Sequence, residues 1–300
     1  MLFLVYRKQI LTYYTMVKDT THSILEISNI NGKSSVTSSK IFRPLKIFNL
    51  DKNKACHLVF SNYGGGFVEG DTINLSIDCK EDTISAFSSQ ANTRIYRSEQ
   101  GKASKQTIKG SIGDNAFVVF MGDPIVPHQK SIFEQHLYWT LGKEAVLLVV
   151  DWFEAGRILN GERFEFDSFF TELKIESNGV PIVWDRFKMN PSINNMNSPG
   201  AFLDHSSYIN IFLAGDENSE RVKSIETQLR FLAAQYFHEH IENKSESLIR
   251  IGSAIKVNEQ VFMVRCSAKN NELLQPFVRA LAEHLSNKDL LGFNLFEGRN

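Results

Sequence analysis

The chain has 300 residues, of which 42% are hydrophobic, and its 33 Lys and Arg residues nearly balance its 34 Asp and Glu residues. A chain of this length can bury a large apolar core as one domain or two. Near-neutral charge without a block of Lys or Arg leaves no electrostatic footprint for nucleic acid. We therefore expect a globular protein with no nucleic-acid partner.

The N-terminal segment is apolar over residues 1–6 but then reaches Arg7 and Lys8. It is too short for the core of a signal peptide and far too short for a membrane span, which needs about 20 residues. The longest other apolar run, residues 145–150, is equally short. The sequence predicts a cytoplasmic protein with no membrane partner.

Residues up to about 190 carry strand-length alternation and turn signals, which predict an all-β segment. Asn31-Gly32, Asn160-Gly161 and Asn178-Gly179 each suit the positive φ angles of a two-residue turn. Residues 162–170 alternate through Phe164 and Phe166 and so read as a strand. Residues 116–120 and 145–150 are apolar without alternation, which predicts strands covered on both faces by two layers of sheet.

Helices are predicted only beyond the polar segment 190–200, a candidate mobile segment. One apolar stripe recurs at three and four residues from about Glu220 to Ile241, and a second runs from Leu274 to Leu285. Residues 248–255 and 260–266 read as a hairpin between them. The fold class that follows is mainly β, with two α-helices in the C-terminal third.

The glycine-rich run at residues 63–71 allows positive φ angles and close approach to the backbone. A phosphate-binding loop would need Lys at position 71, but Asp71 stands there, and the dinucleotide pattern fails at Glu69. The run therefore predicts a tight, bulged connection into a strand. Along that strand, Ile73, Leu75, Ile77 and Cys79 would face inward.

The cysteines and histidines give little support for a metal site. Cys56, Cys79 and Cys266 lack C-x-x-C spacing, which argues against a disulfide framework or a structural zinc site. The neighbours Cys56 and His57 stay open as a metal pair only if the backbone turns there. The run His238-Glu239-His240 lies on a predicted helix, where residues two apart diverge by about 200°.

No catalytic signature is present: no serine has the G-x-S-x-G context, and no histidine lies in H-E-x-x-H. Two alternatives to a scaffold stay open. One is a β-fold hydrolase that uses a carboxylate pair such as Asp123 with Glu134 for general acid and base work. The other is a β-sandwich module that binds a small ligand or a glycan through exposed aromatic side chains.

The glycine-rich run Tyr63–Asp71 is followed, about a strand pair later, by Thr93-Arg94-Ile95-Tyr96-Arg97-Ser98. Together these two segments resemble the core motif of the UreD/UreH family of urease accessory proteins. Arg43–Lys46, Asp123–Pro127, Gly156-Arg157 and Gly161–Phe164 resemble further family motifs. The resemblance runs from about Arg43 to Gly292, but Glu69 stands where many members have Gly. The first 40 residues match no family motif.

The resemblance implies a nonenzymatic scaffold with a β-rich, layered, β-helix-like fold. Such a scaffold would bind apo-urease and recruit a second accessory protein of the F type, which docks a nickel-carrying GTPase of the G type. It also implies a division of the chain into a strand-forming N-terminal extension (1–40), a family domain (41–292) and a tail (293–300). Within that domain, the part up to about 190 would be all-β and the part from about 200 would be α+β.

The resemblance further implies that nickel(II) passes through the protein while no cofactor is bound tightly. The predicted contacts of nickel are Asp71, Glu69, Asp123 and Glu134. The predicted motif and partner-binding residues are Gly65, Gly66, Gly70, Thr93, Tyr96, Arg97, Ser98, Gly156, Arg157, Gly161 and Glu162. Arg94, Arg97, Arg157 and Arg163 either pair with acids of the chain or present a fork to a partner's carboxylates, and internal pairing is favoured.

Overall fold

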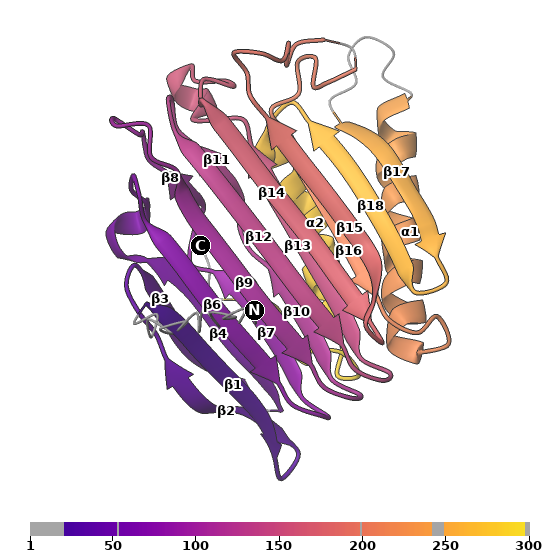
Figure 1. The fold of residues 1–300 in the computed structure, drawn as a ribbon. Helices are drawn as coiled ribbons and strands as arrows, with labels where there is room; N and C mark the ends of the chain where they lie inside the picture. Colours follow the sequence, from indigo (N-terminus) through magenta and orange to yellow (C-terminus); the bar gives the residue numbers. More distant parts are fainter. Residues whose placement is uncertain (1–20, 53, 199, 242–248, 298–300) are drawn as a thin grey trace, which may run out of the picture.

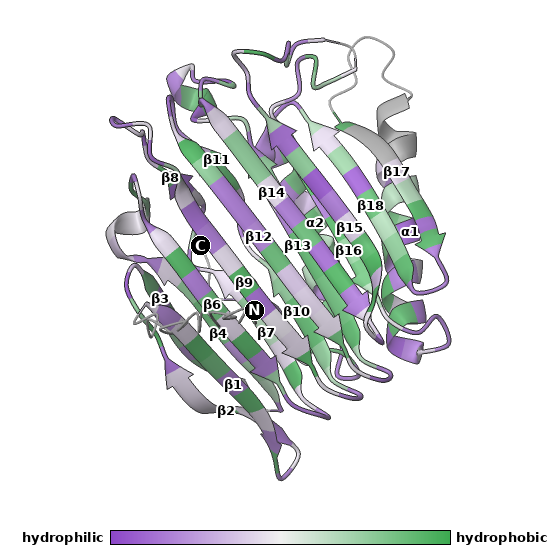
Figure 2. Ribbon diagram, in the orientation of Figure 1, coloured by the Kyte–Doolittle hydropathy of each residue, from purple (hydrophilic) through white to green (hydrophobic). Residues whose placement is uncertain are grey.

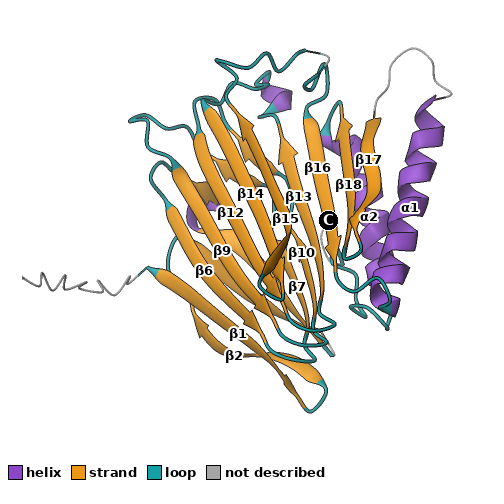
Figure 3. Ribbon diagram, turned by 45° about the vertical axis from the view of Figure 1, so that its right-hand side comes forward, coloured by secondary structure: helices purple, strands orange, loops and turns teal. Residues whose placement is uncertain are grey.

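The computed structural model describes residues 21–52, 54–198, 200–241 and 249–297. These residues form three layers: a seven-stranded sheet, an eleven-stranded sheet and a pair of helices (Figure 1). The helices lie on the side of the eleven-stranded sheet that faces away from the seven-stranded sheet (Figure 3). The predicted fold class, mainly β with two helices near the C-terminus, is confirmed.

The seven-stranded sheet holds its strands in the order β15-β14-β12-β9-β6-β1-β2. Their bounds are β1 (His22–Ile30), β2 (Lys33–Lys40), β6 (Thr72–Cys79), β9 (Ser104–Ile112), β12 (Ile132–Leu141), β14 (Ser168–Ser177) and β15 (Val180–Met189). The main path of the eleven-stranded sheet is β17-β18-β16-β13-β10-β7-β4-β3. Those strands are β3 (Leu45–Lys52), β4 (Ala55–Asn62), β7 (Ile84–Ser89), β10 (Phe117–Met121), β13 (Val146–Glu154), β16 (Ser207–Ala214), β17 (Ile249–Asn258) and β18 (Val261–Ala268).

Three short strands lie off that path: β5 (Gly66–Phe67), β8 (Thr93–Ile95) and β11 (Ile125–Pro127). The chain runs from one sheet through a short strand to the other sheet and back, as in β4-β5-β6, β7-β8-β9 and β10-β11-β12. We call this β-helix-like winding of the chain the coil. Strands of its successive turns pair in parallel, for example β6 with β9 and β10 with β13. The result is the β-helix-like stack that the family resemblance implies.

Side-chain periodicity explains both layers of core. Ile73, Leu75, Ile77 and Cys79 are buried between the sheets, as the alternation predicts, and Figure 2 shows hydrophobic and hydrophilic residues alternating along the seven-stranded sheet. Both faces of β10 and β13 are buried, which confirms the prediction that the apolar runs 116–120 and 145–150 form strands covered on both faces. The cover differs from the expected pair of sheets: a sheet covers one face, and the helices cover the other.

The two helices are α1 (Glu220–Ile241) and α2 (Asn271–Leu285), in agreement with the two predicted stripes. Asn270 caps α2, since its side chain accepts a hydrogen bond from the backbone N–H of Leu273 at 3.2 Å. The buried stripe of α2 includes Leu274, Phe277 and Leu281. Among the described residues, neither helix is long and apolar enough to cross a bilayer.

One predicted strand is wrong. Residues 162–167 are irregular, and β14 begins only at Ser168. Phe164 has φ of 55°, because its ring turns in to pack against Phe153 and Phe202 at centroid distances of 6.3 and 5.0 Å. Asn160-Gly161 likewise closes a short 3₁₀ helix, η2 (Ile158–Asn160), and joins no strand pair.

The N-terminal residues 22–40 form β1 and β2, and β1 pairs in parallel with β6 of the coil. Residues 1–20 lie outside the described residues, as do the side chains of His238, Glu239 and His240. Near the other terminus, Phe293 and Leu295 are buried against the helices. The division of the chain at residues 41 and 293 stays a prediction.

Candidate functional site

The family motifs gather at one side of the coil, where the short strands β5, β8 and β11 lie side by side. Gly66 pairs with Arg94, and Arg94 pairs with Val126, so three distant segments share one register. The backbone N–H of Thr93 also donates to the carbonyl of Pro124 at 2.9 Å. We call this group of segments, residues 63–71, 93–102, 123–131 and 155–164, the motif side of the coil.

Glycine is required at position 66 by the closeness of β8. A Cβ atom there would lie 2.3 Å from the carbonyl oxygen of Arg94, far inside van der Waals contact. Gly65 and Gly70, by contrast, have φ of 73° and 79°, which glycine adopts without strain. The glycine-rich run is therefore a tight connection into β6, as the sequence predicts.

Glu69 ties two of the motif segments together. Its carboxylate accepts hydrogen bonds from the Ser98 hydroxyl at 2.7 Å and from the backbone N–H groups of Glu99, Gln100 and Lys102 at 2.7–3.0 Å. These donors, the Lys102 N–H first among them, lower the pKa of Glu69 to about 2. The residue that departs from the family pattern is thus the anchor of the loop after β8.

Asp71 and Tyr96 hold the glycine-rich turn itself. A carboxylate oxygen of Asp71 accepts from the backbone N–H of Val68 at 2.9 Å, an ordinary turn bond. The Tyr96 hydroxyl donates to the carbonyl of Gly64 at 3.0 Å, and the Tyr96 ring meets the ring of His128 edge-on at 5.2 Å. Burial, followed by the nearby Arg157, lowers the pKa of His128, so its imidazole is neutral at pH 7.

Arg157 and Glu162 close the last segment of the motif side. The Arg157 guanidinium binds the buried Glu162 carboxylate with two hydrogen bonds, one of them 2.9 Å long from Nε, and lowers the pKa of Glu162. Gly156 has φ of 139°, and a Cβ there would lie 2.8 Å from the Glu162 carbonyl oxygen. Gly161 has φ of 81° and ends η2.

The four arginines therefore divide into two kinds. Arg157 is paired internally, and Arg163 donates to Ser206, Asn197 and the carbonyls of Leu203 and His205. Arg97 is half exposed and pairs with its neighbour Glu99 at 2.9 Å, while Arg94 is exposed on β8. Arg94, Arg97 and Arg157 are all exposed, but the Arg157 guanidinium is held by Glu162, which leaves Arg94 and Arg97 as the exposed arginines of the motif side without a buried acidic partner among the described residues.

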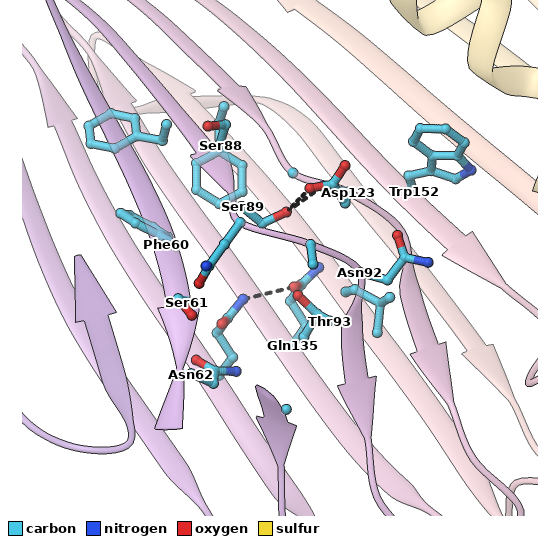
Figure 4. A pocket seen from close by; sticks show the side chains of 18 of the residues that line it. Phe60, Ser61, Asn62, Ser88, Ser89, Asn92, Thr93, Asp123, Gln135 and Trp152 are labelled. Carbon is cyan, nitrogen blue, oxygen red and sulfur yellow. Dashed lines mark hydrogen bonds between the residues drawn. The ribbon is translucent and has the colours of Figure 1, made fainter. Parts of the chain in front are cut away.

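Next to the motif side lies a cavity of about 150 Å³ between the two sheets. Figure 4 shows it from close by, with Ser89, Asp123, Gln135 and Trp152 around it. The Ser89 hydroxyl donates to Asp123 at 2.7 Å and accepts from the Asp123 backbone N–H at 2.7 Å. These two hydrogen bonds fix the Asp123 side chain at the cavity wall.

The cavity holds a second carboxylate, Asp151 of β13, which was not among the four predicted nickel contacts. Gln135 Nε2 donates to Asp151 at 3.1 Å, and the Thr171 hydroxyl donates to it at 3.3 Å. Burial nevertheless raises the pKa of Asp151 to about 6. A carboxylate directly after the apolar run 145–150 was the signal in the sequence.

The four predicted metal contacts do not converge. Glu69 and Asp71 are bound by turn and loop donors, Asp123 lines the cavity, and Glu134 pairs with Lys105 at 2.8 Å. Asp123 and Glu134 are kept apart, because Gln135 of β12 points to the cavity and its neighbour Glu134 points to the opposite face. Within the described ranges, no three His, Cys, Asp or Glu side chains form a metal-binding group.

The remaining residues of the sequence analysis are buried parts of the framework. Cys56, Cys79 and Cys266 are buried and form no disulfide. His57 is buried on β4, where its Nε2 lies 2.8 Å from the Ser88 hydroxyl and its ring stacks on Phe293 at 4.9 Å. These contacts are those of a core histidine.

The sequence of this chain is similar to sequences of known proteins. Residues 20–294 match the family model described as UreD urease accessory protein. A urease accessory protein UreD of Cytophaga hutchinsonii is 87% identical over 285 residues, which is 95% of this chain and all of that relative. A UreD of Actinobacillus pleuropneumoniae is 26% identical over 85% of this chain and 92% of its own length. A urease accessory protein D of Oryza sativa subsp. indica is 27% identical over 57% of each. The family match begins at residue 20, before the first motif recognised in the sequence, and the chain belongs to the UreD family of urease accessory proteins.

Proposed function

We propose that this chain is a nonenzymatic scaffold that binds apo-urease and is needed to load nickel into the urease active site. It recruits a second accessory protein of the F type, and through that protein a nickel-carrying GTPase of the G type. GTP hydrolysis belongs to the GTPase. The scaffold acts in the cytoplasm, where newly made apo-urease would meet it.

The observation that carries the proposal is the family match across residues 20–294. The motif side of the coil adds support, since segments from four parts of the chain pack against one another there. Most motif side chains hold that surface together, whereas Arg94 and Arg97 face solvent from it. A rigid surface with exposed guanidinium groups suits recognition of carboxylates on a protein partner.

Nickel(II) is cargo in this proposal, not a resident cofactor. It accepts carboxylate oxygens as ligands. A site with only a few such oxygens would bind it weakly and so could release it onward. Asp123, with Asp151 on the same cavity, is the predicted contact that the geometry supports best. Asp71, Glu69 and Glu134 stay predicted contacts, although each carboxylate already has a hydrogen-bond or ion-pair partner.

The test is reconstitution in a bacterial host without its own urease. Urease is produced with the other accessory proteins, with and without this chain, and both urease activity and nickel per urease are measured. We expect urease made without the chain to be expressed but poor in nickel and inactive. Active, nickel-loaded urease in its absence would reject the scaffold role.

Single substitutions refine the same assay. Asp71→Asn, Tyr96→Phe and Arg97→Ala should each lower activation, because they loosen the glycine-rich turn or remove the exposed guanidinium of the motif side. Lys143→Ala is the control, since Lys143 is an exposed turn residue on another part of the coil. Full activation of urease by all three variants would show that these motif-side residues are not needed for the proposed function.

A further inference from the structure

The outer face of the seven-stranded sheet carries a groove that is separate from the cavity between the sheets. An open groove of about 360 Å³ runs across β9, β12, β14 and β15, which lie next to one another in the sheet (Figure 1). We call it the Trp184 groove and define it by its lining side chains Lys109, Tyr138, Glu172, Lys174, Trp184 and Arg186. The strand register sets Trp184 beside Lys174, Lys174 beside Tyr138 and Tyr138 beside Lys109.

Glu172 is the fixed centre of the groove. It is only 6% exposed, and its carboxylate accepts from the Tyr138 hydroxyl at 2.7 Å, Trp184 Nε1 at 2.9 Å and Arg186 Nε at 2.6 Å. His136 Nδ1 lies 3.1 Å from the same carboxylate. The charge of Glu172 is therefore used within the protein, and it holds three neighbouring side chains in set orientations.

Trp184 is the apolar element of the groove. Its indole N–H is satisfied by Glu172, yet the residue is 60% exposed, so the ring surface is open to a partner. The guanidinium carbon of Arg186 lies 4.4 Å from the ring centroid. A rigid Trp beside an Arg is the composition that dominates binding energy at protein interfaces.

The charges that remain favour an acidic partner. Lys109, Lys174 and Arg186 line the groove against the two carboxylates of Glu172 and Glu176. Glu172 is buried, and Glu176 pairs with Lys174 at 2.5 Å. Lys109 is exposed and makes no ion pair with any side chain that the structure describes. The groove thus has a positive excess in a chain whose net charge is −1.

We propose that the Trp184 groove docks an acidic segment of a protein that the scaffold assembles with. An apolar side chain of that segment covers the Trp184 ring, and a carboxylate pairs with Lys109. Lys109 and Trp184 are three strand spacings apart, about 14 Å, which about four extended residues can span. This inference rests on the proposed function, because it gives the scaffold a contact surface distinct from the motif side.

The test measures binding of the full chain, by calorimetry, to purified apo-urease and separately to the second accessory protein. The variants are Trp184→Ala and Lys109→Glu. The matched controls are Phe231→Ala, an aromatic residue 61% exposed on α1, and Lys143→Glu, an exposed lysine outside the groove. Thermal unfolding of each variant checks that the fold is retained.

We expect Trp184→Ala to weaken binding to one of the two proteins by about 10- to 100-fold. Lys109→Glu should weaken the same interaction by about 3- to 10-fold, more strongly at low salt than at high salt. Both controls should bind as the unchanged chain does. A Lys109→Glu effect that fades at high salt, beside a Trp184→Ala effect that persists there, would identify the acidic segment as the occupant.

Other outcomes overturn the inference and separate it from the proposed function. If the chain binds its partners and both groove variants bind equally well, the scaffold role stands and the groove is not an interface. If Trp184→Ala weakens binding but Lys109→Glu strengthens it, the occupant is not acidic. If the unchanged chain binds neither protein, the proposed function fails, and the inference fails with it.

Discussion

Gln135 of β12 and Asp151 of β13 meet across the space between the two sheets, where Gln135 Nε2 donates to an Asp151 carboxylate oxygen at 3.1 Å. Gln135 Oε1 also accepts a hydrogen bond from Gln106 Nε2 at 3.0 Å, and Gln135 Nε2 donates one to the Thr171 hydroxyl at 3.1 Å. A polar chain thus crosses an otherwise apolar layer beside the cavity. Its buried carboxylate, Asp151, has a raised pKa and so links this part of the interior to pH.

Asp151→Asn should stabilise the protein at neutral pH. Burial raises the pKa of Asp151 in the folded protein to about 6, above its ordinary value of 3.8, so the folded state binds the proton more tightly than the unfolded state. Ionisation therefore costs stability as pH rises from about 4 through 6. Asn keeps the acceptor for Gln135, and we expect a gain of about 1–3 kcal/mol at pH 7.5 and almost none at pH 4.

Urea unfolding at both pH values measures this difference. Asp167→Asn is the control, because Asp167 is exposed and lies outside the cavity. A gain for Asp151→Asn that is the same at pH 4 and pH 7.5 would contradict a raised pKa.

Glu69→Ala should release the loop after β8 without unfolding the coil. The backbone N–H groups of Glu99, Gln100 and Lys102 lose their common acceptor, so their hydrogens should exchange with solvent faster. Hydrogen exchange of the peptide that spans residues 98–102 measures the effect.

Glu99→Ala is the matched control for that experiment, since it removes an exposed carboxylate of the same loop that pairs only with Arg97 at the surface. Equal exchange in both variants would show that Glu69 does not anchor the loop.

The sequence predicts the elements better than the site, and the glycine turns show why. Asn31-Gly32 connects β1 to β2, and Asn178-Gly179 connects β14 to β15. These turns are predictable because the flanking strands alternate in burial, which fixes their pairing locally. Asn160-Gly161 carries the same dipeptide but closes η2. There, the buried ring of Phe164 and the Arg157–Glu162 pair decide the backbone, and both depend on tertiary contacts.

The cavity was out of reach for a related reason. Asp123 was found through its motif and Asp151 was visible only as a carboxylate after an apolar strand, because no local pattern shows that they line one space. Their proximity depends on the register between turns of the coil, which pairs residues far apart in the chain. Local periodicity carries no such information.

Gly66→Ala should be strongly destabilising. Its Cβ would lie 2.3 Å from the Arg94 carbonyl oxygen, so β5 and β8 would have to separate and the motif side would lose its register. We expect a loss of about 3 kcal/mol or more in the free energy of unfolding. Gly200→Ala is the control, since no atom lies within 4 Å of its added Cβ; similar stability of both variants in urea unfolding would refute the close approach.

Glu172→Gln should destabilise the protein in a way that disappears in acid. Burial opposes the charge of Glu172, but hydrogen bonds from Trp184, Tyr138, Arg186 and His136 together lower its pKa to about 2, below its ordinary value of 4.5. The folded state then releases the proton more readily than the unfolded state, so the stabilisation is complete above about pH 5 and is lost as pH falls towards 2. Because the side chain is buried, we expect a cost of about 1–3 kcal/mol at pH 7.

The measurement is the difference in unfolding free energy between Glu172→Gln and the unchanged chain at pH 7, 5 and 3. The difference should shrink at pH 3, where the unchanged chain has lost most of the same stabilisation. Glu176→Gln serves as control, because Glu176 pairs at the half-exposed edge of the groove with Lys174. A cost for Glu172→Gln that stays constant down to pH 3 would mean that packing, and not the carboxylate charge, holds Trp184 and Arg186 in place.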